Sequence, residues 1–144
     1  MKNTFKKYYF YYFYCFYRFW ENGPSIWWSE WKALLSVFVI EVYSLLSFLL
    51  MLMVITKTDV FPNFSKLELT LLGLIPWTIN HRIFMHNDNW KLWVEEFDSL
   101  PKEVNRKGKR VFWIINIAIL GSLLFNFYLL SQIDWSVYNP NYGK

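Results

Sequence analysis

Five polar residues lie within or beside apolar segments of the chain, where a membrane interior would make them costly. They are Glu41, Asn80, His81, Arg82 and Asn116. A carboxylate and an imidazole that meet inside a membrane can relay protons, so Glu41 and His81 could form a proton- or ion-handling site. The alternative, which we favour, is that the group holds helices together, with a neutral Glu41 and amide side chains that hydrogen-bond between helices.

Other residue patterns that carry chemistry are missing from the sequence. His81 and His86 are five residues apart, so a helix does not place them on one face, and no carboxylate at ligand spacing joins them. The single cysteine, Cys15, excludes an intramolecular disulfide and a cysteine-based zinc site. The chain has no glycine-rich phosphate loop and no nucleophile motif. We therefore predict no metal, no cofactor, no catalytic residue and no enzymatic activity.

Three apolar segments must position the polar residues. The chain has 144 residues, of which 55% are hydrophobic and 18% charged, whereas an ordinary soluble domain is about 25% charged. Residues 33–55 and 111–131 are long and apolar enough to cross a hydrocarbon core of about 30 Å. Residues 67–85 have a shorter clean apolar stretch, broken by Pro76, which also permits a re-entrant segment. We predict an all-α fold in which residues 25–131 form a membrane domain of three transmembrane helices.

The distribution of basic residues predicts how these segments are oriented. Lys and Arg collect in the cytoplasmic segments that flank membrane spans. If all three segments cross, 12 of the 15 basic residues fall on one side of the membrane. This favours three crossings of an inner membrane, with a cytoplasmic N-terminus and residues 132–144 as a tail on the outside.

Residues 1–24 form an aromatic, basic N-terminal segment. Between Tyr8 and Trp20, eleven of thirteen residues are aromatic. The stretch is too short to span, and amphipathic rings concentrate at the headgroup level, so we predict a helix at the membrane interface. Because a helix here carries rings on every face, lipid would cover only one side of it. The other side would bind a partner protein, unless the segment packs on the chain's own spans. The rings assigned to lipid or to a partner are Tyr8, Tyr9, Tyr12, Phe16 and Trp20.

Residues 88–100 predict a short amphipathic helix on the cytoplasmic membrane face. Trp90, Trp93 and Phe97 recur with helical spacing on one side, and we assign these rings to lipid or to a partner as well. The other side carries carboxylates, which is unusual for a helix that lies on lipid. Those carboxylates would pair either with a basic partner protein or with the chain's own basic run at residues 106–110.

Three short motifs flank these segments: SEWKA at residues 29–33, EFDSLPK at 96–102 and FYLLSQIDWS at 127–136. With them the chain resembles a family of small bacterial three-span inner-membrane proteins of no known activity. The resemblance implies the three-span layout over most of the chain after residue 20. It implies no activity and no site residues.

These observations predict a non-enzymatic accessory or assembly subunit of a larger membrane protein complex, which docks through the aromatic N-terminal segment and the amphipathic helix. The expected partners are membrane lipids and other membrane subunits, with a homo-oligomer also possible and no nucleic acid. One alternative is a small oligomeric channel, proton-conducting or holin-like, that uses Glu41. A further alternative is a membrane immunity protein.

Overall fold

The computed structural model describes residues 4–58 and 65–138. Every regular element within these ranges is helical, which confirms the predicted all-α class. The elements are α1 (Thr4–Glu21), α2 (Ser29–Thr56), α3 (Lys66–Phe84), η1 (His86–Asp88), α4 (Asn89–Asp98), α5 (Lys102–Ser131) and α6 (Trp135–Tyr138). Each of the five helical segments expected from the sequence corresponds to one of the helices α1 to α5.

Two of these helices, α2 and α5, are long and apolar enough to cross a membrane. Only 17% of the most apolar stretch of each is buried within the chain, unlike the core helix of a soluble protein. These two helices indicate a membrane location. The helix α3 does not reach the same apolar length, because it carries Lys66 and Glu68 in its first turn and His81 and Arg82 in its last turn.

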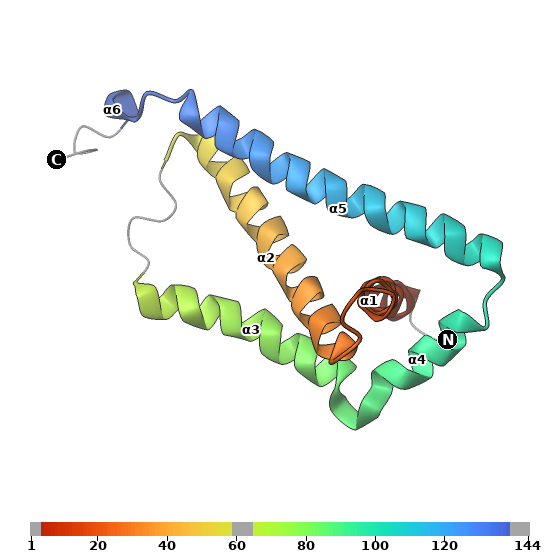
Figure 1. Ribbon diagram of the computed structural model, residues 1–144. Helices are drawn as coiled ribbons and strands as arrows, with labels where there is room; N and C mark the ends of the chain where they lie inside the picture. Colours follow the sequence, from red (N-terminus) through yellow and green to blue (C-terminus); the bar gives the residue numbers. More distant parts are fainter. Residues whose placement is uncertain (1–3, 59–64, 139–144) are drawn as a thin grey trace.

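The helices α2 and α5 run in the same direction and meet at their C-terminal halves (Figure 1). Ser47 and Ser122 share a hydrogen bond of 2.8 Å, and the buried amide of Asn126 donates to the carbonyl oxygen of Ser47 at 2.8 Å. Leu50 and Leu123 pack beside these contacts. Small side chains that hydrogen-bond between helices are typical of helix pairs in membranes. Toward their N-terminal ends the two helices diverge.

The helix α3 returns in the opposite direction and approaches α2 near its own C-terminal end (Figure 1). Ser65 is the N-cap of α3 and forms a capping box, in which the side chains of Ser65 and Glu68 each accept a hydrogen bond from the other's backbone N–H group. Further along, Trp77 packs edge-on against Phe38 of α2 at a centroid distance of 5.5 Å. From this contact the N-terminal part of α3 diverges from α2.

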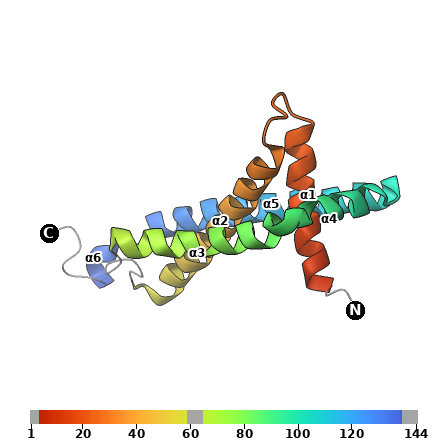
Figure 2. The same ribbon diagram turned by 90° about the horizontal axis from the view of Figure 1, so that it is seen from below.

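The aromatic helix α1 lies crosswise to α3 and α5, in the space enclosed by α2, α4 and α5 (Figures 1 and 2). Phe10 and Phe13 on α1 are fully buried, and Phe13 stacks on Phe84 of α3 at 4.4 Å. The helix ends at Glu21, where the following Asn-Gly-Pro sequence does not continue a helix. The aromatic helix is therefore the centre of the hydrophobic core.

The amphipathic helix α4 covers the side of α1 that faces away from α2. Trp93 stacks on Phe10 at 4.8 Å, and the fully buried Phe97 packs edge-on against Tyr11 at 5.1 Å. The apolar face of α4 is thus turned to α1 rather than to lipid. For the aromatic segment, the structure shows the arrangement that the sequence left open as an alternative, in which the rings pack on the rest of the chain.

Candidate functional site

The carboxylate of Glu41, within the apolar helix α2, meets two hydrogen-bond donors where α1, α2 and α3 converge. The hydroxyl of Tyr9 donates to Glu41 Oε1 at 2.5 Å, and the amide nitrogen of Asn80 donates to Glu41 Oε2 at 2.5 Å. The Tyr9 hydroxyl also contacts Asn80 Oδ1. Asn80 is 1% exposed, so its amide is held in this place by packing as well as by hydrogen bonds. Both oxygens of the carboxylate therefore accept a hydrogen bond from a neutral group.

Asn116 lies in a separate contact on α5. Its Oδ1 accepts a hydrogen bond of 2.8 Å from the hydroxyl of Tyr12, and its amide nitrogen donates to the carbonyl oxygen of Phe112 at 2.7 Å. Asn116 is 5% exposed. The aromatic helix thus binds a polar side chain on each of the three long helices through two tyrosines, with Tyr9 contacting α2 and α3 and Tyr12 contacting α5.

The structure does not bring His81 and Arg82 to Glu41. Both side chains are exposed, and the His81 ring lies beside Trp31 at a centroid distance of 5.6 Å. The physical reason is that successive residues of an α-helix point about 100° apart, so His81 and Arg82 do not point in the direction of Asn80, which meets Glu41. Of the five predicted polar residues, Glu41 and Asn80 meet directly, Asn116 is bound elsewhere on α1, and the other two lie outside the contact.

Sequence reasoning assigned Tyr9 and Tyr12 to lipid or a partner and missed their role as donors. A buried phenol needs a polar partner, and this rule was the available signal. Five tyrosines of α1 follow it, whereas Phe10 and Phe13 occupy buried positions and stack on other rings. The pairs are Tyr9 with Glu41, Tyr11 with Asn105, Tyr12 with Asn116, Tyr14 with Asp98, and Tyr17 with Glu21.

The remaining rings of the predicted lipid or partner surface are mostly covered by the chain itself. Phe97 is fully buried, while Phe16, Trp20, Trp90 and Trp93 are half-buried against the core. Trp20 donates a hydrogen bond of 2.9 Å to Ser36 on α2. Tyr8, by contrast, is 71% exposed.

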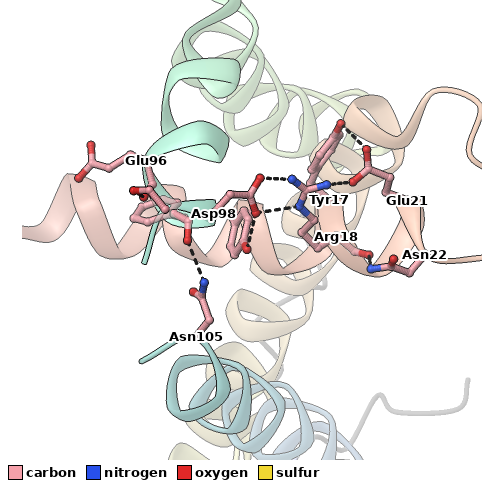
Figure 3. A network of polar contacts seen from close by, with 10 residues as sticks. Tyr17, Arg18, Glu21, Asn22, Glu96, Asp98 and Asn105 are labelled. Atoms are coloured by element: carbon pink, nitrogen blue, oxygen red, sulfur yellow. Dashed lines mark hydrogen bonds and ion pairs between the residues drawn. The ribbon is translucent and has the colours of Figure 1, made fainter. Parts of the chain in front are cut away.

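A charged network ties α1 to α4 (Figure 3). The guanidinium of Arg18 lies between Asp98 of α4 and Glu21 of its own helix and pairs with both. Burial by itself would lower the pKa of Arg18, but the two carboxylates outweigh burial and raise it. At the other end of α1, Lys7 pairs with Glu96 at 3.2 Å. Glu96 and Asp98 of α4 thus pair with basic residues of α1, and not with the run at residues 106–110.

The tyrosines predict how stability depends on pH. Burial is the main cause that raises the pKa of Tyr12, Tyr14 and Tyr17 from 10 to about 12, with the carboxylates beside Tyr14 and Tyr17 adding to it. Above pH 10 the unfolded chain therefore loses protons that the folded chain retains, so the stabilisation is fully present below pH 10 and falls as the pH approaches 12. We expect the midpoint of thermal unfolding, followed by circular dichroism in detergent, to fall in this window.

The control for this titration is a Tyr12→Phe and Tyr17→Phe double variant, which removes two of the shifted phenols. Its unfolding midpoint should fall less steeply with pH than that of the unchanged chain. An equally steep fall in both proteins would mean that these phenols do not cause the dependence.

Comparison of the chain with protein families, with curated proteins and with solved structures finds no match.

Proposed function

We propose that the protein is a three-span membrane subunit, with its N-terminus in the cytoplasm, that serves as a non-enzymatic accessory or assembly component of a larger membrane complex. The shared direction of α2 and α5 supports three crossings, because two parallel spans require the intervening chain to return across the membrane. The helix α3 has 19 residues and would measure about 28 Å, close to the hydrocarbon thickness. The excess of basic residues at one end supports the orientation.

The crosswise course of α1 supports a position in the plane of the membrane, at the cytoplasmic ends of the spans (Figure 2). Lys32 at the start of α2 and the basic run that begins α5 lie near this level of the chain. In the same region Trp27 and Trp28 are 79% and 73% exposed. Exposed indole rings are enriched at the headgroup level, where they anchor a protein.

The observation that carries the accessory role is the face that α3 leaves without a neighbour. Leu67, Leu71, Leu74, Ile75 and Ile79 follow one side of the helix, and each is at least half exposed. Between Trp77 and Phe84, α3 makes ring contacts and a hydrogen bond to α1 and α2. A spanning helix gains stability from packing on other helices, so a helix of a partner subunit is the occupant that we propose for this face.

A glycine on α5 supports close approach of a partner helix there as well. A Cβ atom placed on Gly121 would have no atom within 4 Å. Small residues on an open helix face let the backbone of another helix come near, which is how many membrane helices associate. Because α1 and α4 cover each other, we place the docking surface on α3 and α5 rather than on the two segments proposed from the sequence.

The test is photocrosslinking of the full chain in its native membrane. We would place a benzoyl-phenylalanine at Leu71 and, in a matched protein, at Leu92, which is 66% exposed on the outer side of α4. We expect one second polypeptide, recovered in stoichiometric amount after gentle solubilisation, to crosslink from position 71 and not from position 92. Crosslinks to lipid alone, together with a chain that purifies without a partner, would overturn the proposal. Crosslinks from position 92 alone would move the docking surface to α4.

A further inference from the structure

An apolar groove of about 600 Å³ runs between α1 and the first turns of α5. The buried rings of Phe97 and Phe112 are among its lining residues. On the α5 side, Val104, Val111 and Ile115 line it and are between 42% and 55% exposed. A volume of this size is typical of a small-molecule site. Val111 and Ile115 of the lining belong to the apolar part of α5.

Gly108 lets α1 approach α5 closely at one wall of the groove. The ring of Tyr11 lies directly on the α5 backbone at this position, and a Cβ atom on Gly108 would come within 2.6 Å of Tyr11 Cε1. Tyr11 is fixed there by a hydrogen bond of 3.1 Å to Asn105 Oδ1. Any larger residue at position 108 would displace this ring, so the absence of a side chain allows α1 to approach α5 and shapes the wall of the groove.

Two lysines line the groove, Lys107 on α5 and Lys7 on α1. Lys107 is exposed, and none of the ion pairs between described residues includes it. Lys7 pairs with Glu96 but keeps 45% of its side chain exposed. Along α5, Lys107 precedes Val111 and Ile115 by one and two turns, so charge and apolar surface follow each other along one face.

We infer that an anionic phospholipid of the bilayer binds in this groove, with its phosphate between Lys7 and Lys107 and one acyl chain along Val111 and Ile115. The features match the molecule: two lysines for the phosphate, and an apolar wall that continues from Lys107 along Val111 and Ile115. Basic pockets on the cytoplasmic side of membrane helices bind phospholipid headgroups by the same chemistry. The inference rests on the proposed membrane placement but does not require a partner subunit.

Native mass spectrometry of the full chain in a neutral detergent tests the inference, and it does so whether or not a partner exists. Palmitoyl-oleoyl phosphatidylglycerol and the corresponding phosphatidylcholine are added at equal concentration. We expect the phosphatidylglycerol adduct to exceed the phosphatidylcholine adduct about tenfold, because only the former carries a net negative charge. Equal adducts of both lipids would overturn the inference. So would displacement of the lipid by inorganic phosphate, since the phosphate lacks an acyl chain.

Variants assign the binding to this groove. Lys7→Gln with Lys107→Gln should bring the phosphatidylglycerol adduct down to the level of phosphatidylcholine, and Lys107→Arg should retain it. Lys57→Gln with Lys91→Gln removes the same charge elsewhere and should leave the adduct unchanged. A control pair that loses as much lipid as the groove pair would contradict the assignment. Val111→Trp, which fills the groove from an exposed position, should abolish binding of both lipids; unchanged binding would also contradict it.

Discussion

Replacement of Phe13 by alanine is expected to lower the free energy of unfolding by about 3–5 kcal/mol, the range for a large buried ring. Phe13 is 1% exposed and stacks on Phe84 at 4.4 Å. Because α1 lies inside the space enclosed by α2, α4 and α5, a cavity at Phe13 loosens all the contacts of this helix at once. We expect the variant to release α1 while α2 and α5 remain paired through Ser47 and Asn126.

The measurement is unfolding of the full chain in detergent, followed by tryptophan fluorescence, together with limited proteolysis of α1. The matched control is Phe19→Ala, the same change on the same helix at a ring that is 50% exposed. The control should lower the free energy of unfolding by less than about 1 kcal/mol, because the Phe19 ring is only half buried in the folded protein. Equal losses in the two variants would show that α1 is not the centre of the core.

Replacement of Tyr9 by phenylalanine is expected to destabilise the protein by about 1–3 kcal/mol, because it leaves Glu41 Oε1 and Asn80 Oδ1 without the donor that they share. The cost of an unsatisfied buried group exceeds the net gain of the bond itself. Tyr8→Phe is the matched control, since Tyr8 is exposed, and it should change stability by no more than a few tenths of a kcal/mol.

A double-mutant cycle with Glu41→Met separates the hydrogen bond from other effects. The double variant should be destabilised by less than the sum of the two single variants, by roughly 1–2 kcal/mol, because removing both partners leaves fewer groups unsatisfied. Additive losses would mean that Tyr9 and Glu41 do not stabilise the fold through each other.

A variant of Glu41 also distinguishes a structural role of this residue from the pore that the sequence left as an alternative. In the structure Glu41 is engaged by Tyr9 and Asn80, and His81 does not reach it. In liposomes that contain the purified chain, we expect Glu41→Gln to leave the proton flux unchanged. A flux that is present in the original chain and lost in this variant would instead support a channel.

The positions of the helices along the sequence were predictable, because the residue patterns that indicate a helix are local. The apolar residues 33–55 and 111–131 lie within α2 and α5, and the predicted segment 67–85 differs from α3 by one residue at each end. The spacing of Trp90, Trp93 and Phe97 predicted α4 equally well. Length, periodicity and breaking residues are read from neighbouring positions, and they fix an element without reference to the rest of the chain.

The contacts between elements were predictable only in part. The sequence indicated that Glu41, Asn80 and Asn116 need polar partners inside the membrane, and each of them has one. It did not indicate that the donors are tyrosines of α1, because Tyr9 is 71 residues from Asn80 and Tyr12 is 104 residues from Asn116. Nor did it show that Lys7 and Arg18, rather than the run at 106–110, pair with the carboxylates of α4.

The sequence by itself determined an all-helical chain with two apolar helices and an aromatic N-terminal helix. It also determined that polar side chains in the apolar segments need hydrogen-bond partners. Only the tertiary structure decided that the aromatic helix supplies them. Where α2 and α5 diverge, the space between them must be occupied by other side chains. The helix α1 supplies buried phenylalanine rings for the apolar contacts and tyrosine hydroxyls for the polar side chains. Such complementarity depends on the crossing of helices, which no local pattern encodes.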